Sequence, residues 1–256
     1  MRSPAQLRDL VEGYLAGVEL SPDLGDLAEA VRYGFEAGGK RVRPVICLAT
    51  GEAAGAGPER VLPAAAALEL VHSFSLVHDD LPALDNDDVR RSRPSTWARF
   101  GEADAILAGD ALLAEASRQA LSYETPAVAR ELAEATLGMI GGQHLDIHGD
   151  EHDLAALHQL KTGRLFAASV GCALWAAGVA AADQAPWRAF GEELGLLFQI
   201  VDDVLDEDGY FLVHGADGAR GLAADAAARA YERLDEIAAD TSVLAEIVRD
   251  LSIRTR

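Results

Sequence analysis

The sequence predicts one all-α domain, a bundle of about ten helices covering residues 1–256. Apolar residues recur at helical spacing along almost the whole chain, and the strict alternation that marks a half-buried strand is absent. Caps, prolines and glycines interrupt these apolar stretches at helical lengths. Neither repeats nor low-complexity linkers divide the chain, so a second domain is not expected.

Helix starts and ends carry chemical signals. Ser21 followed by Pro22 is a cap with proline at the first helical position, and Gly38 and Gly39 end that helix. Pro63 is expected to open the long helix that ends in aspartates. The expected helices are residues 5–17, 21–35, 44–54, 63–80, 103–122, 126–142, 153–182 (one helix or two), 186–208, 216–236 and 241–252.

The chain is acidic, with 22 basic against 42 acidic residues and a net charge of −20. This balance argues against nucleic acid and against an anionic membrane surface as partners. Cys47 and Cys172 lie among apolar neighbours, and two cysteines form neither a disulfide framework nor a zinc site. No long apolar stretch follows the N-terminus, so a cytoplasmic protein is expected. The uncharged stretch 165–182 is interpreted as a buried helix, not an integral membrane span.

Residues 69–110 contain the strongest chemical signal. An apolar helical segment leads into five aspartates within ten positions, and three arginines follow (Asp79, Asp80, Asp85, Asp87, Asp88; Arg90, Arg91, Arg93). Carboxylates at a helix C-terminus oppose its dipole and repel one another, at about 3 kcal/mol for a pair ~5 Å apart at an effective dielectric near 20. A cation is expected there, and Mg2+ with a phosphate ligand is the natural candidate, the alternative being a solvated acidic loop.

A second acidic cluster ends another apolar helix. Asp202 and Asp206 are four residues apart and therefore share one helix face, and Asp203 lies beside them. The residues before them are apolar nearly all round the helix, which predicts burial, and buried carboxylates need a partner or a metal. Two such clusters are less expected by chance than one.

Basic residues accompany both clusters. Lys40 and Arg43 follow the Gly-Gly turn, Arg90 and Arg91 follow the first cluster, and Lys161 lies in a stretch with little charge. Lys40 and Lys161 are the only lysines in the sequence, all other basic residues being arginine. Each group alone fits a solvated surface. Together they suit a phosphorylated substrate, since metal bridges carboxylate to phosphate while arginine or lysine binds the outer oxygens.

Other catalytic arrangements find little support. A di-iron bundle needs two Glu-x-x-His motifs, and the segment from Glu69 to His72 is the only one in the sequence. No Ser-His-Asp or Cys-His arrangement is suggested, and no glycine-rich phosphate loop follows a strand.

Six motifs, in order, resemble those of the trans-prenyltransferase family, the polyprenyl diphosphate synthases. They are GGKRVRP, HSFSLVHDDLPALDNDDVRR, FGEADAILAGDALL, GGQHLDI, HQLKTG and GLLFQIVDDVLD, within about residues 35–206. The resemblance implies an isoprenoid synthase-like bundle around a central cavity, usually homodimeric. It also implies Mg2+-dependent, head-to-tail condensation of isopentenyl diphosphate with an allylic diphosphate, through a carbocation inside walls that exclude water.

The resemblance assigns metal ligands and an allylic diphosphate site. Three Mg2+ ions, or Mn2+, would be held by the two aspartate motifs (Asp79, Asp80, Asp85; Asp202, Asp203, Asp206). Asp79, Asp85 and Asp202 would be the most direct ligands, and Arg90 and Lys161 would bind the same diphosphate.

The remaining matched positions concern the second substrate and the reacting centre. The diphosphate of isopentenyl diphosphate would be bound by Lys40, Arg43, His72 and Arg91. Thr162 and Gln199 would line the place where the cation forms, and Gln143 and Asp146 match a motif in the cavity wall. The catalytic residues are therefore expected to be Asp79, Asp80, Asp85, Arg90, Lys161, Thr162, Gln199 and Asp202.

Product length and one deletion distinguish this chain. Phe74, five residues before the first aspartate, with Ser75 beside it, would form a cavity floor that resembles bacterial farnesyl diphosphate synthases. After Asp206 the family usually has a lysine-containing loop, whereas here only a shortened link around 207–211 is present. That link removes part of the expected lid over the allylic diphosphate.

Three functions fit these residues. The first is an active short-chain prenyltransferase making farnesyl diphosphate, with geranylgeranyl diphosphate as the alternative product. The second is a weakly catalytic partner subunit of a prenyl synthase, supported only by the missing loop. The third is a class I terpene cyclase, disfavoured by Lys40, Arg43 and His72 because a cyclase needs no isopentenyl diphosphate site. Intact aspartate motifs favour the first.

Overall fold

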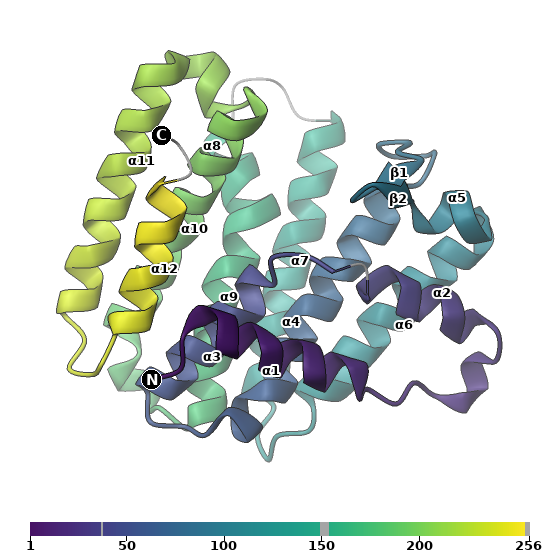
Figure 1. Ribbon diagram of the computed structural model, residues 1–256, viewed down its shortest axis with the longest axis horizontal. Helices are drawn as coiled ribbons and strands as arrows, with labels where there is room; N and C mark the ends of the chain where they lie inside the picture. The colour runs from purple at the N-terminus through teal and green to yellow at the C-terminus, as the bar shows by residue number, and fades with distance from the viewer. Residues whose placement is uncertain (37, 149–153, 254–256) are drawn as a thin grey trace.

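Helices make up nearly all the regular structure of the computed structural model (Figure 1), which describes residues 1–36, 38–148 and 154–253. They are α1 (Pro4–Ala16), α2 (Leu27–Phe35), α3 (Val42–Ala53), α4 (Pro58–Asp79), α5 (Thr96–Phe100), α6 (Glu102–Ala120), α7 (Ala127–His148), α8 (Leu154–His158), α9 (Arg164–Ala177), α10 (Ala185–Asp206), α11 (Tyr210–Asp235) and α12 (Ser242–Ile253). Short 3-10 turns occupy Pro22–Leu24 and Ala181–Asp183. The all-α prediction is confirmed.

One small hairpin departs from the purely helical expectation. Strands β1 (Val89–Arg90) and β2 (Arg93–Pro94) pair antiparallel. Arg91 and Ser92 between them have φ values of 53° and 62°, so both central residues of the turn are left-handed. Such turns match the twist of a two-stranded ribbon. Two-residue strands are too short for alternation to mark them in a sequence.

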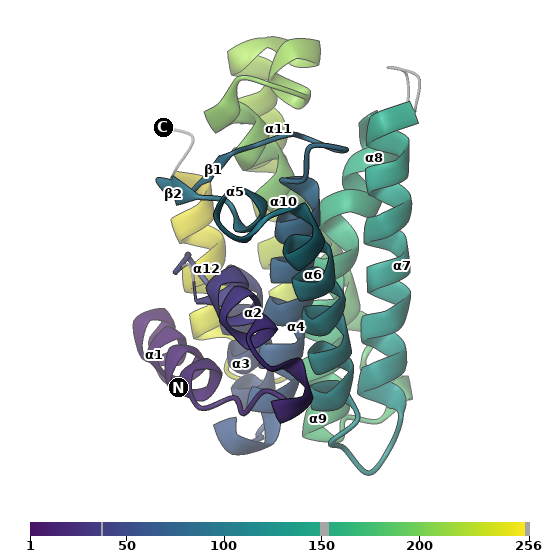
Figure 2. The same cartoon turned by 90° about the vertical axis from the view of Figure 1, so that its right-hand side faces the viewer.

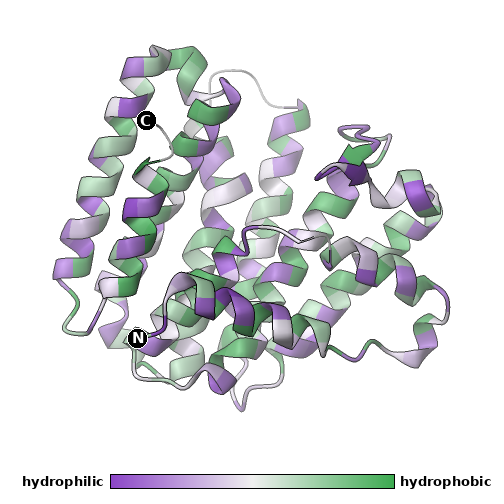
Figure 3. Ribbon diagram, in the orientation of Figure 1, coloured by the Kyte–Doolittle hydropathy of each residue, from purple (hydrophilic) through white to green (hydrophobic). Residues whose placement is uncertain are grey.

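Helix α4 lies at the centre of the bundle and contacts α3, α6 and α9. Its length and composition would allow it to cross a membrane, but 67% of that apolar stretch is buried inside the protein. The neighbouring α9, which contains much of the uncharged stretch, is buried along most of its length. Along α1 and α11 at the periphery, hydrophobic and hydrophilic residues alternate (Figure 3). The burial of α4 and α9 explains why their sequences lack an amphipathic pattern.

Two helix starts differ from the sequence expectation. The second helix begins at Leu27, not at Ser21, because Gly25 has a φ of 50° and interrupts the chain after a 3-10 turn. Helix α4 begins at Pro58, and Pro63 lies inside it. Proline near the start of a helix removes a single hydrogen bond, to the carbonyl four residues earlier, and this helix continues through it.

The segment between α7 and α10 is almost continuously helical. Five residues, Gln159–Gly163, form a π-helical segment between α8 and α9. Helix α7 does not stop at Gly142: a Cβ there would lie 2.4 Å from the Lys161 backbone nitrogen, so the glycine permits close helix contact. The expected helix 153–182 is thus two helices joined by a π turn, and residues 149–153 lie outside the described part.

The shortened link is three residues long. Glu207 and Gly209, which have φ values of 57° and 46°, turn the chain from α10 into α11. The final long helix therefore begins at Tyr210, six residues before the expected start, and breaks once at Gly215. The C-terminal ends of α4, α7 and α10 meet at one end of the bundle, the upper end in Figures 1 and 2.

Candidate active site

A cavity of about 910 Å³ lies among α4, α7, α10, the π-helical segment and the loop before α3. It gathers eleven of the predicted site residues from five stretches of sequence. These are Lys40, Arg43, His72, Phe74, Ser75, Asp79, Arg90, Arg91, Lys161, Thr162 and Asp202. The other five, Asp80, Asp85, Gln199, Asp203 and Asp206, are not part of its lining.

The two aspartates that end α4 have different surroundings. Asp79 lines the cavity, and burial raises the pKa of its carboxyl to about 6, with Lys161 opposing the rise and Asp85 adding to it. The side chain of Asp80 is 3% exposed and accepts hydrogen bonds from Arg90, one of them 2.8 Å from Nε. Asp80 therefore holds Arg90, and Asp79 faces the cavity.

The loop after α4 folds back onto the end of that helix. The backbone N–H of Asp85 donates to the Asp79 carbonyl at 2.9 Å, and that of Asp87 donates to the Asp80 carbonyl at 3.1 Å. Asp85 is exposed. The segment from Asp79 to Asp85 therefore forms a hydrogen-bonded turn at the end of α4.

The second aspartate motif repeats this division. Asp202 lines the cavity, and desolvation raises the pKa of its carboxyl, with Asp206 adding to the rise. Asp203 is 6% exposed and accepts hydrogen bonds from Gln199 Nε2 at 2.6 Å and from the Tyr210 backbone N–H at 2.8 Å. Asp203 therefore joins α10 to the first residue of α11, while Asp206 remains exposed.

The carboxylates of this site suit a hard divalent cation. Asp79 and Asp202 face one cavity, and burial raises the pKa of both carboxyls, with Asp85 and Asp206 adding to the rise. No group of three potential ligands that could hold a metal alone occurs in residues 1–36, 38–148 and 154–253. Mg2+ is commonly held by one or two carboxylates plus substrate phosphates. The donors therefore fit ions that complete their coordination with a diphosphate.

Cationic side chains occupy the side of the cavity near α3. The guanidinium of Arg43 lies 4.6 Å from the centre of the Phe166 ring, and burial lowers its pKa to about 10, so it stays charged at neutral pH. Burial lowers the pKa of His72 well below its usual value, and the nearby Arg43 and Arg91 lower it further. His72 is therefore neutral there, able to donate one ring N–H and accept at the other nitrogen.

The π-helical segment places Lys161 and Thr162 on the cavity wall. The Lys161 ammonium contacts Asp146 on α7, with Nζ 2.5 Å from Oδ2. Gln143, one turn earlier on α7, also lines the cavity, and both polar atoms of its side-chain amide are buried without a hydrogen-bond partner among the described residues. Single π turns inside helices are frequent at functional sites.

Phe74 and residues of α7 form apolar walls. Phe74 is 8% exposed and meets His78 edge-to-face, with ring centres 4.9 Å apart. From α7, Met139, Ile140 and Ile147 line the opposite part of the cavity.

Sequence reasoning missed three contributors to this site. His78 lines the cavity one turn after Phe74 and contacts the Ile106 carbonyl at 3.0 Å. Arg41 and Glu69 form a buried ion pair beside the basic residues. The Glu-x-x-His spacing placed Glu69 on the same helix face as His72, but it suggested only a metal site. Arg41 lies between Lys40 and Arg43, and nothing in the sequence distinguished it from them.

A helical bundle with one carboxylate of each aspartate motif on the wall of a single, largely apolar cavity defines the isoprenoid synthase class. The solved structure of a geranyltransferase from Legionella pneumophila superposes with a TM-score of 0.86 at 32% identity, covering 98% of this chain and 94% of that one. A sequence profile described as polyprenyl synthetase matches residues 25–215. The chain belongs to the polyprenyl synthetase family.

Relatives with different products resemble this chain about equally. A farnesyl diphosphate synthase from Micrococcus luteus is 40% identical over 74% of this chain and 69% of its own length. A geranylgeranyl diphosphate synthase from Cyanophora paradoxa is 41% identical over 70% of this chain and 64% of its own length. The chain thus spans about two thirds of the length of these relatives, and identity alone does not select a product.

Proposed function

We propose that this chain is a prenyltransferase that condenses isopentenyl diphosphate with dimethylallyl or geranyl diphosphate to give farnesyl diphosphate. One observation carries the proposal: a single cavity joins carboxylates of both aspartate motifs, two sets of cationic side chains and apolar walls. This donor set suits two diphosphates with apolar tails, because each diphosphate needs cations and each tail needs a dry surface. The relatives named farnesyl and geranylgeranyl diphosphate synthases support the same reaction class.

Asp79, Asp85 and Asp202 are the proposed ligands of three Mg2+ or Mn2+ ions, with Asp80, Asp203 and Asp206 supporting them. When bound, such ions neutralise the departing diphosphate as Lewis acids. Arg90, oriented by Asp80, and Lys161, near Asp146, bind the outer oxygens of the same diphosphate. These side chains stabilise negative charge that grows as the allylic C–O bond breaks, which lowers the barrier to ionisation.

The second diphosphate is proposed to bind to Lys40, Arg43, His72 and Arg91, which lie on the α3 side of the cavity. Neutral His72 contributes a ring N–H as donor, while Arg43 and Lys40 supply charge. This placement directs the double bond of isopentenyl diphosphate toward the allylic carbon. Thr162, on the cavity wall, presents an oxygen atom near the cation, whereas Gln199, which was expected beside it, lies outside the lining and donates to Asp203. The proton lost at the end passes to the released diphosphate.

The apolar walls protect the cation from water. Phe74, with Ser75 beside it, is the proposed floor that stops the growing chain. An aromatic floor five residues before the first aspartate resembles that of bacterial farnesyl diphosphate synthases and favours a fifteen-carbon product. Geranylgeranyl diphosphate is the second candidate, supported by the Cyanophora paradoxa relative of equal similarity.

A cytoplasmic homodimer is the proposed form of the protein. Large apolar side chains are exposed along the neighbouring helices α6 and α7, among them Ile106, Leu107 and Leu137. Exposed apolar surface of this kind, on two helices side by side, suits contact with a second copy.

The test is isopentenyl diphosphate-dependent release of diphosphate with Mg2+ and each of the five-, ten- and fifteen-carbon allylic partners. Release with the five- or ten-carbon partner, abolished by a metal chelator, is the expected result. Release only with the fifteen-carbon partner would favour the geranylgeranyl product. A folded protein that binds diphosphates but releases none with any partner would instead support the partner-subunit function.

A further inference from the structure

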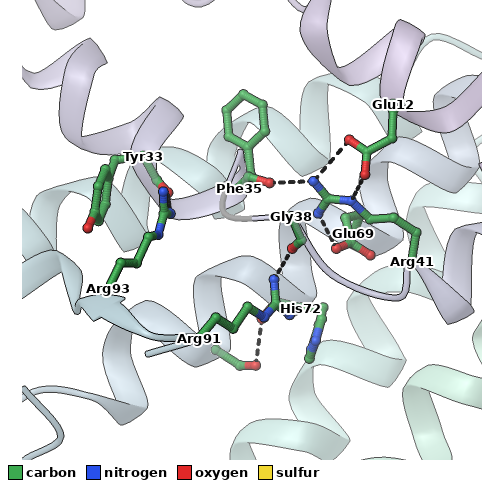
Figure 4. Close-up of polar contacts among 10 residues, drawn as sticks. Glu12, Tyr33, Phe35, Gly38, Arg41, Glu69, His72, Arg91 and Arg93 are labelled. Carbon is green, nitrogen blue, oxygen red and sulfur yellow. Dashed lines mark hydrogen bonds and ion pairs between the residues drawn. The ribbon is translucent and has the colours of Figure 1, made fainter. Parts of the chain in front are cut away.

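Glu69 is a buried carboxylate that the proposed reaction does not use. It lies on α4, one helical turn before His72, and only 3% of its side chain is exposed. Its Oε1 atom is 2.5 Å from the Arg41 guanidinium, whose side chain is 1% exposed (Figure 4). A buried pair of this kind is rigid, because neither charge can leave its partner without a large desolvation penalty.

Arg41 is fixed through its backbone and side chain alike. Its φ and ψ of 47° and 38° are left-handed, a conformation that residues other than glycine seldom adopt. Its guanidinium also donates to Glu12 on α1, with Nε 2.9 Å from Oε1, and to the Phe35 carbonyl at 2.7 Å (Figure 4). The side-chain contacts to α1, α2 and α4 therefore hold a strained residue just before α3.

The strained residue lies between two cations of the cavity. Lys40 precedes Arg41, and Arg43 follows it by two positions at the start of α3. Lys40, Arg43 and His72 line the cavity. Arg41 and Glu69 belong to the same wall, but their side chains are only 1% and 3% exposed and are bonded to each other. Fixing the backbone at Arg41 therefore sets the direction of both cationic side chains relative to His72 on α4.

Glu69 also has the largest effect of any neighbouring charge on Arg43 and Arg91. It raises the pKa of Arg43 and of Arg91 against the lowering caused by burial. The charges that act on Asp79, across the cavity, come instead from Lys161, Asp85, Arg90 and Asp80. Its electrostatic influence therefore falls on one side of the site.

We propose that the Arg41–Glu69 pair is a positioning device for the non-allylic substrate: its two charges bind each other, and the pair aligns Lys40, Arg43 and His72 on the diphosphate of isopentenyl diphosphate. The inference rests on the proposed function and deepens it. The inference explains the Glu-x-x-His spacing without a metal site. It predicts that loss of the pair weakens binding of isopentenyl diphosphate but not of the allylic substrate.

Glu69→Gln is the direct test, because glutamine keeps the volume and one acceptor oxygen but removes the charge. We expect KM and the calorimetric Kd for isopentenyl diphosphate to rise about tenfold, while KM for geranyl diphosphate changes less than about twofold. The matched control is Glu12→Gln, which alters the other carboxylate on Arg41. Glu12 is 38% exposed, so its loss is expected to change either KM by less than about threefold.

If Glu69→Gln does not fold, the double variant Arg41→Met with Glu69→Met removes both charges and leaves none unpaired. It should show the same selective loss. Equal rises in both KM values, or a lower melting temperature with unchanged KM values, would overturn the inference. If the wild type turns over normally and the Glu69→Gln variant has the same KM values, only the positioning role is refuted. Wild-type protein that neither binds isopentenyl diphosphate nor turns over would refute the proposed function as well.

Discussion

At the residue scale, neighbouring aspartates divide the work of the site. Consecutive side chains on a helix point about 100° apart, so the two members of each Asp-Asp pair cannot face the same way. Asp79 and Asp202 face the cavity, while Asp80 and Asp203 face partners within the protein. From the sequence motifs alone, all six aspartates were equally good candidates for metal ligands. Their separation depends on how the chain folds back after each helix, which brings Arg90 to Asp80 and the Tyr210 N–H to Asp203.

Asp79 gives a prediction about pH. Burial raises the pKa of its carboxyl to about 6, so between pH ~4 and ~6 the native protein holds a proton that the unfolded chain releases. The contribution of this carboxyl to the stability of the metal-free protein therefore falls as pH rises through this range. Asp79→Asn should raise the free energy of unfolding by about 2 kcal/mol at pH 7 and leave it nearly unchanged at pH 4. The same variant should abolish turnover.

Denaturant unfolding in chelator at both pH values measures this. The control, Asp110→Asn, replaces an exposed aspartate on α6 and should show no such difference between the two pH values. A pH-independent effect of Asp79→Asn would refute the account of its burial. Normal turnover by the variant would refute the metal assignment.

Phe74 gives a prediction about product length. Phe74→Ala removes the proposed floor, and we expect products of twenty carbons or more, read by chromatography of the dephosphorylated alcohols. The matched control, Met139→Ala, trims another buried side chain of the same cavity and should leave the length unchanged. Longer products from the Met139 variant alone would move the chain-length role to α7.

At the element scale, the junction of α10 and α11 is where the resemblance predicts a difference from the family. Three residues replace the expected lysine-containing loop, and Asp203 is bonded to both sides of the junction through Gln199 and the Tyr210 N–H. His158 lies beside it, with Nδ1 3.6 Å from the Asp203 carboxylate. The shorter link has thus placed a carboxylate of the second motif at the start of the next helix.

Asp203→Ala should therefore act on stability. Loss of a carboxylate that caps a helix start costs about 1–2 kcal/mol, and the two donors it leaves unpaired act in the same direction. Asp202→Ala should leave the free energy of unfolding unchanged or slightly raised, while turnover is lost. Urea denaturation of both variants makes the comparison. Equal stability of the Asp203 variant and wild type would contradict the capping role.

The helices were predictable because apolar periodicity is local, whereas several ends were not. Pro58 and Pro63 both suit a helix start, and only the packed structure selects the first. Gly25 delayed α2 because its positive φ is a backbone property invisible to periodicity. The basic loop and the aspartate motifs were predictable as a site because their charges stand out. Arg41 and Glu69 were not, because their pairing joins α3 to α4 across the fold.

At the scale of the whole molecule, charge is separated. The chain carries a net charge of −20, yet Lys40, Arg43, Arg90, Arg91 and Lys161 converge on one cavity. A cationic cleft in an acidic protein attracts anions to that cleft and repels them elsewhere. On the proposed function, this field would concentrate both diphosphates at the cavity.

The apolar surface of α6 and α7 gives a prediction about assembly. Leu107 and Leu137 are 50% and 70% exposed. Leu107→Glu with Leu137→Glu should convert a dimer to a monomer in sedimentation velocity, because like charges would be buried across a symmetric interface. Leu212→Glu, on α11 and equally exposed at 70%, is the control that should remain dimeric. A dimer unaffected by the double variant would place the interface elsewhere.

The central claim is that one cavity condenses two diphosphates to a fifteen-carbon product despite the shortened link. The most direct measurement supplies radiolabelled isopentenyl diphosphate with Mg2+ and geranyl diphosphate, then sizes the product. A labelled farnesyl product is the predicted result, and it would show that the lysine-containing loop is dispensable. Folded protein that yields no labelled product with geranyl or any other allylic diphosphate would contradict the claim.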